Sequence, residues 1–372
     1  MSDTDIPEAD RAPGAPHPRE SQRVIGQDVA EAEFLDAYAA DRVHHAWMIS
    51  GPRGIGKATL AWRIARFLLA TPVDDGGMLG APEPPKSLDI APDNPTTKRL
   101  LALSEPRLFV LRRPWDAKTE RIRTEITVDE VRKLKGFFAL SSTDGGRRVV
   151  IVDAADELNV SAANALLKLL EEPPQDTVML LIAHQPSRLL PTILSRCRQL
   201  RCQTLTPQQI TEILDQSGLH IDAGSDALAA LSGGSAGAAL RLHTLDGLAI
   251  YQTIVDIFAN PRDRQKTLAL AESMTGRANV DRLDLTIELF DLFLARISRA
   301  GVTGPPSPVA AKGEAQVFST LSKDPRAARA WAELQQVVSR RSQHARAVNL
   351  DPAALILDIV FKAHETAAKM SA

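Results

Sequence analysis

Cysteine is almost absent from this sequence, and neither sign of charge dominates it. Of the 372 residues only Cys197 and Cys202 are cysteines. Two cysteines cannot form a disulfide framework or a four-cysteine zinc site, so we expect a protein of the reducing cytoplasm. The 44 Lys and Arg residues are nearly balanced by 46 Asp and Glu residues, giving a formal net charge of -2. This balance argues against a freestanding, strongly basic nucleic-acid binder, because such proteins rely on clustered Lys and Arg.

Long apolar runs are also missing. No stretch approaches the roughly 20 apolar residues that a membrane helix needs, and no hydrophobic segment follows basic residues near the start of the chain. We therefore expect neither export nor membrane insertion. Any contact with DNA should be local or shared with partner proteins.

The composition changes abruptly near residue 24. Residues 1–23 combine Asp, Glu, Pro, Gly and Ser with almost no apolar side chain, a mixture that cannot offset the entropy lost on ordering. We therefore predict a disordered tail over residues 1–23. The remaining chain is long enough for two or three domains, each with its own core.

Short apolar runs alternate with helical patterns up to about residue 203. We predict buried strands at residues 46–49, 108–111, 148–153 and 178–182, with amphipathic helices between them. Such alternation predicts an α/β fold with a doubly wound parallel sheet, whose ligand site lies at the carboxyl ends of the strands. Past residue 204 we expect only helices, with a Pro- and Gly-rich break at 301–308.

The first predicted strand leads into a sequence that is almost a phosphate-binding loop, Gly51-Pro-Arg-Gly-Ile-Gly-Lys57. Glycines of this type let backbone N–H groups converge on phosphate oxygens at the start of a helix. The next position normally supplies a hydroxyl to Mg²⁺, but here it is Ala58, and Thr59 is rotated from it by about 100°. The candidate nucleotide-binding residues are Gly51, Pro52, Arg53, Gly54, Ile55, Gly56, Lys57, Ala58, Thr59 and Asp153.

Asp153 ends the most apolar predicted strand and is the expected carboxylate near a metal. It is followed by Ala154, while Asp156 and Glu157 lie further on, in what we expect to be the first turn of the next helix. These residues favour nucleotide binding with little or no hydrolysis. The alternative is a vestigial loop that merely ends a strand, and the residues leave open whether ATP or ADP is still bound.

Several segments in the same order resemble the clamp-loader branch of the AAA+ proteins. They are Val24-Ile-Gly-Gln27, the loop at 51–57, Asn164-Ala-Leu-Leu-Lys-Leu-Leu-Glu-Glu-Pro-Pro174, Leu194-Ser-Arg-Cys-Arg198 and Gly233-Gly-Ser-Ala-Gly-Ala-Ala-Leu240. The resemblance covers about residues 24–241, and beyond it only the helical character agrees. It implies an AAA+ α/β domain at 24–203, a small helical lid at 204–243 and an all-α collar at 244–372.

The resemblance also implies a role for Arg196 in the Ser195-Arg196-Cys197 triplet. In clamp loaders this motif places an arginine at the subunit boundary, where it reaches the γ-phosphate of ATP bound by the neighbour. A permanently charged, planar guanidinium suits that task. The alternative is an ordinary surface arginine near a strand end.

Departures from the family pattern all concern hydrolysis. Ala58 and Ala154 replace the hydroxyl and the catalytic carboxylate, Ala183 occupies the sensor position, and Gly237 stands where hydrolysing relatives carry a lid arginine. We therefore expect a largely non-hydrolysing subunit that acts as a stator and lends Arg196 to an ATPase neighbour.

The implied partners are motor subunits of the tau or gamma type, a delta subunit and, through the complex, the sliding clamp and primed DNA. No cofactor is required on this interpretation, although ATP or ADP without hydrolysis is compatible with it. Many relatives bind zinc through four cysteines in the excursion after the first helix, here residues 71–94. That stretch has no cysteine, so we expect no zinc and no other metal, and we expect Cys197 to pack as an apolar side chain.

Two other functions remain as hypotheses. An active clamp-loader ATPase subunit would use Thr59 and a displaced carboxylate such as Asp156. An isolated DNA-binding ATPase of recombination or repair is disfavoured by the acidic balance and by the Ser-Arg-Cys motif.

Overall fold

The computed structural model describes residues 7–12, 14–71, 85–139, 146–220, 224–348 and 350–371. The chain forms two compact units. The first unit ends at Ser217 and also includes Ser235–Gly237, whereas the second contains Gly218–Gly234 and the chain from Ala238 onward. These units do not follow the expected boundaries at 203/204 and 243/244, so the lid and collar ranges stay a prediction.

The first unit is built on a five-stranded parallel sheet with the order β2-β5-β6-β1-β7. Its strands are β1 (Ala46–Ser50), β2 (Leu108–Arg112), β5 (Arg148–Asp153), β6 (Thr177–Ala183) and β7 (Arg198–Arg201). In register, Ser50 lies opposite Ala183, and Arg112 lies opposite Asp153. These two pairs are at the carboxyl ends of the strands, the edge where the sequence predicts a ligand site.

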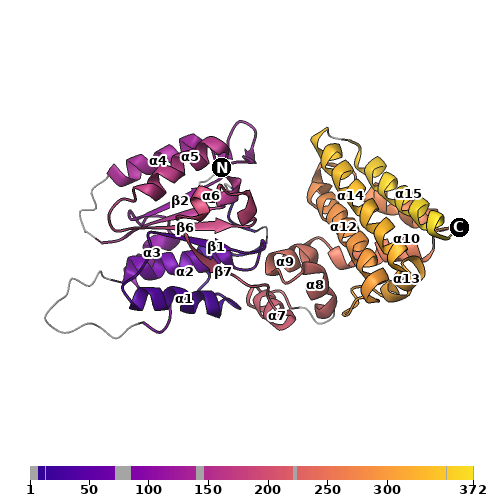
Figure 1. The fold of residues 1–372 in the computed structure, drawn as a ribbon, viewed down its shortest axis with the longest axis horizontal. Helices are drawn as coiled ribbons and strands as arrows, with labels where there is room; N and C mark the ends of the chain where they lie inside the picture. Colours follow the sequence, from indigo (N-terminus) through magenta and orange to yellow (C-terminus); the bar gives the residue numbers. More distant parts are fainter. Residues whose placement is uncertain are drawn as a thin grey trace. The chain divides into compact units, whose positions relative to one another are not determined.

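Helices cover both faces of this sheet (Figure 1). The helices of the first unit are α1 (Asp28–Ala39), α2 (Lys57–Ala70), α3 (Pro95–Leu101), α4 (Val128–Ala139), α5 (Val160–Glu171), α6 (Pro191–Leu194) and α7 (Pro207–Gln216). Alternate residues of each strand face opposite sides, so Trp47 joins one apolar core and Met48 the other. The doubly wound α/β fold expected from the sequence is therefore confirmed.

Two features of the first unit were not predicted. A small antiparallel hairpin, β3 (Trp115–Asp116) with β4 (Arg121–Ile122), follows β2. The edge strand β7 follows the Ser-Arg-Cys triplet directly. With only four residues, of which Leu200 alone is buried, β7 has little of the apolar pattern that marks a strand in sequence.

The prediction of a disordered tail is wrong for the described residues between 7 and 23. A single 3-10 turn, η2 (Pro18–Glu20), lies beside α2, and His17 is fully buried against the ring of Trp62. The segment's backbone carbonyls accept hydrogen bonds from Arg63 and Arg66 of α2. Composition did not reveal this because the segment is held by polar and ionic contacts with the rest of the unit, not by its own apolar side chains.

The second unit is all-helical in the residues that the structure describes. Its elements are α8 (Ser225–Ser232), α9 (Ala236–Thr244, which begins in the first unit), α10 (Gly247–Ala259), α11 (Arg264–Ser273), η5 (Arg277–Asn279), α12 (Val280–Thr303), α13 (Glu314–Leu321), α14 (Pro325–Ala347) and α15 (Pro352–Ser371). The expected break at 301–308 begins later than predicted, because α12 continues to Thr303. A Cβ at Gly301 would lie 2.9 Å from that of Ala328, so glycine here permits close packing.

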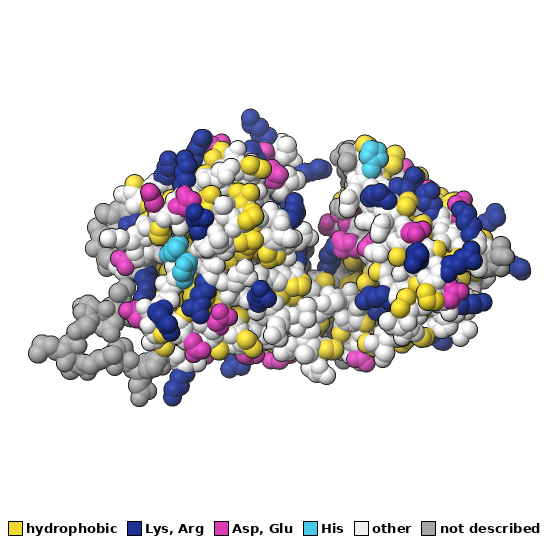
Figure 2. All heavy atoms as spheres, in the orientation of Figure 1, with side chains coloured by type: hydrophobic (Ala, Val, Ile, Leu, Met, Phe, Trp, Pro, Cys, Tyr) yellow, Lys and Arg dark blue, Asp and Glu magenta, His cyan; other side chains and the backbone are white. Residues whose placement is uncertain are grey.

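Charge is dispersed over both units. On the faces drawn in Figure 2, Lys and Arg side chains are interspersed with Asp and Glu over each unit, as the near-zero net charge predicts. Among the described helices none has the length and apolarity required to cross a membrane.

Candidate functional site

The phosphate-loop sequence forms the turn between β1 and α2. Three of its residues, Gly51, Gly54 and Gly56, have φ values of +146°, +75° and +98°. A Cβ at Gly51 would lie 2.8 Å from the carbonyl oxygen of Cys202, so only glycine fits there. The strand, glycine turn and helix expected from the sequence are all present, and α2 begins at Lys57.

The lysine of the loop is turned onto the loop itself. Lys57 is buried, and its Nζ donates a hydrogen bond to the carbonyl oxygen of Pro52 at 2.5 Å. Burial lowers the pKa of Lys57 to about 8. The pKa of Asp153 is raised to about 7, chiefly by burial and then by the negative charges of Asp10 and Glu157. Near neutral pH this carboxyl is therefore only partly ionised.

Magnesium does not fit these residues. Ala58, at the start of α2, offers no side-chain oxygen at the position that normally supplies a hydroxyl to Mg²⁺. Mg²⁺ requires hard oxygen ligands in a near-octahedral arrangement. The loop keeps the backbone shape of a phosphate cradle, but its environment does not provide the ligands for the metal that accompanies ATP.

The carboxylates after β5 are occupied by other groups. Asp156 and Glu157 lie in the 3-10 turn η3 (Ala155–Glu157) that precedes α5, and not in the first turn of α5 as expected. The Asp156 carboxylate accepts hydrogen bonds from the backbone N–H groups of His184 and Gln185, at 3.0 and 2.9 Å. Glu157 forms an ion pair with Arg113 at 2.7 Å. Both acidic side chains therefore have structural partners.

A short segment of the first unit, Ser235–Gly237, packs directly on the loop. The Ser235 hydroxyl donates to the carbonyl oxygen of Arg53 at 2.8 Å, and the Gly237 N–H donates to that of Gly54 at 3.0 Å. A Cβ at Gly237 would lie 3.0 Å from the Gly54 Cα. Gly237, which stands where hydrolysing relatives carry a lid arginine, thus lies against the loop. A side chain at this position would disturb the packing of Gly237 on Gly54.

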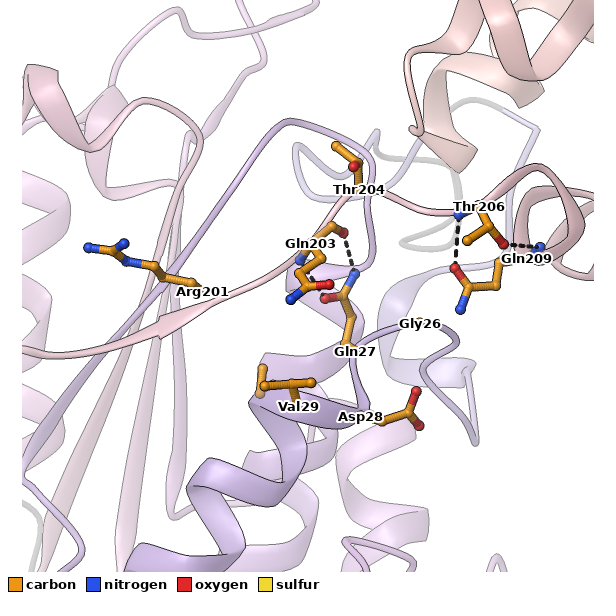
Figure 3. Close-up of a pocket in the computed structure, with 10 residues that line it drawn as sticks. Gly26, Gln27, Asp28, Val29, Arg201, Gln203, Thr204, Thr206 and Gln209 are labelled. Carbon is orange, nitrogen blue, oxygen red and sulfur yellow. Dashed lines mark hydrogen bonds between the residues drawn. The ribbon is translucent and has the colours of Figure 1, made fainter.

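Gln27 connects the loop with the segment that follows β7. Its side chain is 2% exposed and donates to the carbonyl oxygens of Ile55 and Gln203, at 2.8 and 2.9 Å. It also accepts from the Gln203 N–H at 2.9 Å, as the dashed lines between these two residues in Figure 3 indicate. A pocket at this junction is lined by Gln27 and Gln203 themselves together with Gly26, Arg201 and Gln209, among others. Through these hydrogen bonds of Gln27, the segment Val24–Gln27 has a structural role.

Arg196 lies between α6 and β7 on the surface of the first unit. Its backbone N–H donates to Ile193 in the last turn of α6. One guanidinium nitrogen donates to the carbonyl oxygen of Thr192 at 3.0 Å, and the other lies 2.9 Å from a carboxylate oxygen of Glu171. The side chain is 35% exposed, so the predicted finger residue remains accessible at the end of a fixed turn.

Sequence reasoning missed His184, which follows β6 directly. Its ring is held neutral, because burial and then the positive charge of Lys57 lower its pKa to about 4. Its Nδ1 is buried and has no hydrogen-bond partner among the described residues. The signal in sequence was only its place, one residue beyond Ala183 at the end of a buried strand.

The two cysteines are apolar in character. Burial raises the pKa of Cys197 to about 12 and that of Cys202 to about 11, and Cys197 packs against the core between the sheet, α4 and α5. Within the described parts of the chain, no group of His, Cys, Asp and Glu residues is arranged to hold a metal ion. Most of the 71–94 excursion considered for zinc lies outside the described residues.

Comparison with known proteins gives a family match and several relatives. Residues 26–206 match the family model described as DNA polymerase III, delta subunit. DNA polymerase III subunit delta' of Pseudomonas aeruginosa is 42% identical over 200 residues, covering 54% of this chain and 56% of that protein. Subunit delta' of Escherichia coli is 32% identical over 230 residues, covering 61% and 63%. The chain therefore spans less than two thirds of the length of these relatives.

More distant similarities extend to other proteins. The gamma/tau subunit of Mycobacterium tuberculosis is 30% identical over 209 residues, covering 55% of this chain and 33% of that protein. Among solved structures, a gamma subunit-related protein of Thermotoga maritima gives a TM-score of 0.42 at 16% identity, covering 91% of this chain and 99% of that one. The architecture of this chain is described by its own strand order and register.

Proposed function

Residues 26–206 of this chain match the family model described as DNA polymerase III, delta subunit, and from this match we propose that the chain is a delta-prime-type subunit of a bacterial clamp loader. It acts in DNA replication as a stator that does not hydrolyse ATP in its own cleft. It supplies Arg196 to the ATP site of a neighbouring motor subunit. Loading of the sliding clamp onto primed DNA is then the work of the complete assembly.

The main support for a non-hydrolysing role is that the acidic side chains after β5 already bind other groups of the protein. An ATPase needs a carboxylate that polarises the attacking water. The residue after Asp153 is Ala154, and each carboxylate oxygen of Asp156 accepts a hydrogen bond from a backbone N–H group. Glu157 is paired with Arg113. The alternative of an active ATPase using Thr59 and Asp156 is disfavoured by these contacts.

The chemistry proposed for Arg196 is electrostatic. Charge accumulates on the γ-phosphate oxygens as the phosphoryl group leaves ADP, and an arginine delivered from a neighbouring protein accelerates this step by about 10³- to 10⁵-fold in well-studied systems. The guanidinium is planar and permanently charged, and here it lies on an accessible turn next to β7. In this proposal, association of the subunits brings Arg196 to the neighbour's ATP. The chain itself therefore needs no bound nucleotide or metal.

The proposed partners are tau- or gamma-type motor subunits and a delta subunit, with the sliding clamp and primed DNA reached through the complex. The relatives' names, subunit delta' and subunit gamma/tau of DNA polymerase III, support such an assembly. We propose the bacterial cytoplasm as the location, because replication takes place there. ATP or ADP bound without hydrolysis remains compatible with the loop.

The test is reconstitution of the loader with its motor and delta subunits, comparing wild type with Arg196→Ala. We expect the variant to assemble normally and to lower clamp- and DNA-stimulated ATP turnover at least about tenfold, since it removes a transition-state contact. Arg188→Ala is the matched control, because Arg188 is an exposed arginine that, like Arg196, precedes β7 in the chain but lies outside the Ser-Arg-Cys triplet. Assembly is measured by size-exclusion chromatography.

Two results would count against the proposal. Unchanged turnover with Arg196→Ala would remove the finger assignment. Steady ATP hydrolysis by the purified chain alone, at rates typical of a loader, would reject the stator role and favour the active ATPase.

A further inference from the structure

Arg196 is held by a carboxylate from a different element, Glu171 at the end of α5. We propose that Glu171 is a positioning residue, which keeps the Arg196 guanidinium oriented for the neighbour's triphosphate. This inference rests on the proposed function, because it assigns a role within the same interface. It concerns a residue 25 positions earlier in the sequence than the triplet, which lies beside it only in the folded chain.

Two contacts fix the guanidinium at its two terminal nitrogens. The first nitrogen donates to the carbonyl oxygen of Thr192 at 3.0 Å, a contact local to the turn. The second lies 2.9 Å from the carboxylate of Glu171. Since a planar guanidinium is held at both ends, its plane is fixed with respect to α5 and α6, and the rotamer freedom of a long side chain is restricted before the partner arrives.

The turn that bears Arg196 is itself well defined. The Ser195 hydroxyl donates to the Thr192 carbonyl oxygen at 3.1 Å, and the backbone N–H of Arg196 donates to Ile193 at 3.1 Å. Next in the chain, Cys197 packs against the apolar core that includes α5. The backbone under the arginine is therefore fixed independently of Glu171, which acts with the Thr192 carbonyl oxygen to restrict the direction of the side chain.

The pair is exposed enough to be used. The side chains of Arg196 and Glu171 are 35% and 43% exposed. An arginine has five N–H donors, and the carboxylate engages only one edge of the fork. Donors of Arg196 therefore remain for phosphate oxygens while Glu171 stays in place. In this arrangement the carboxylate orients the guanidinium and does not need to be displaced.

Glu172 provides a matched control within the same motif. It is the next residue, is exposed, and has the same side chain, but the ion pair with Arg196 is made by Glu171. A general effect of negative charge near the interface would appear with either glutamate. A positioning effect should appear only with Glu171.

The experiment compares Glu171→Ala, Glu171→Gln, Glu172→Ala, Arg196→Ala and the double variant Glu171→Ala/Arg196→Ala in the reconstituted loader. We expect Glu171→Ala to lower kcat for stimulated ATP turnover about three- to tenfold with unchanged KM, because a misplaced catalytic group affects the transition state. Glu171→Gln keeps an acceptor for the guanidinium and should retain more activity than Glu171→Ala. Glu172→Ala should match wild type.

The double variant separates positioning from a purely structural role. If Glu171 acts through Arg196, adding Glu171→Ala to Arg196→Ala lowers turnover no further. An additional loss would show that Glu171 acts elsewhere and would overturn the inference. A gain in turnover with Glu171→Ala would also overturn it, because it would mean that Glu171 competes with the phosphate for the guanidinium. Normal turnover with Glu171→Ala but reduced turnover with Arg196→Ala overturns this inference alone. Normal turnover with Arg196→Ala overturns the proposed function and this inference with it.

Discussion

Asp156 accepts a hydrogen bond from the backbone N–H of His184 at 3.0 Å, and so ties the turn after β5 to the end of β6. The same carboxylate takes the next N–H, from Gln185, at 2.9 Å. In a parallel sheet these two strand ends meet at the edge where a ligand site is expected. Asp156 therefore has a structural role in joining the ends of β5 and β6, although its position in the sequence also fits a displaced catalytic base.

The structural role of Asp156 can be tested by measuring the stability of variants. Asp156→Ala leaves two backbone N–H groups without their acceptor, so we expect the free energy of unfolding of the first unit to fall by about 1–3 kcal/mol. Asp156→Asn keeps one acceptor oxygen and should give an intermediate loss. Urea unfolding followed by tryptophan fluorescence measures this, because Trp47, Trp62 and Trp115 lie in the first unit. Equal stability of all three proteins would show that the carboxylate does not carry this contact.

The central strands of the sheet were predictable because they are buried on both faces. Residues of β5 and β6 are almost continuously apolar, and that pattern is legible without tertiary information. The edge strand β7 was not, since only Leu200 of its four residues is buried. Its place is set by pairing with β1 and by the contacts of Gln27 with Gln203, which join residues 176 positions apart.

The candidate site was predictable only in its local part. The loop at 51–57 has its glycines and lysine in one run of sequence, so spacing alone located it. The partners of Asp156, Glu157 and Arg196 come from distant segments, and no local pattern encodes them. The same reason explains the wrong prediction for the N-terminal residues, whose composition says nothing of the arginines on α2 and β2.

The pH dependence of stability should reveal the buried Asp153. Its pKa is about 7 in the folded chain against an ordinary 3.8. The folded state thus binds this proton more tightly than the unfolded chain, so its contribution is fully present below pH 4 and is lost as the pH rises to about 7. Asp153→Asn removes this loss, and its advantage over wild type should grow by at most about 4 kcal/mol between pH 4 and pH 8. Urea unfolding across this range measures it, and parallel pH curves for the two proteins would contradict the prediction.

The N-terminal contacts predict a coupling between Asp10 and Arg112. Arg112 at the end of β2 pairs with both Asp10 and Glu8, and the Asp10 side chain is fully buried. Asp10→Ala and Arg112→Ala should each lower the free energy of unfolding by about 1–3 kcal/mol, because each removes one member of a largely buried ion-pair network that also contains Glu8 and His17. In a double-mutant cycle the two losses should not add. Strict additivity would mean that the segment does not hold Arg112 in solution.

A buried ionic network in the second unit gives a last prediction, independent of the proposed function. Glu314 is fully buried, binds Arg296 through two hydrogen bonds of 2.8 and 3.0 Å, and accepts from the Tyr251 hydroxyl at 2.6 Å. Burial and then the charge of Glu314 raise the pKa of Tyr251, so the hydroxyl remains a donor.

Glu314→Ala leaves the buried Arg296 charge without an opposite charge, although Arg296 still donates to the Pro308 carbonyl oxygen, and should cost about 3–5 kcal/mol. Tyr251→Phe removes one neutral donor while the ion pair remains, and should cost only about 1 kcal/mol. Hydrogen exchange of the α12 and α13 amides measures both effects within the second unit. If the two variants were equally destabilised, the ion pair would contribute no more than the tyrosine hydrogen bond, and Glu314 would be retained for its packing with α10 and α12.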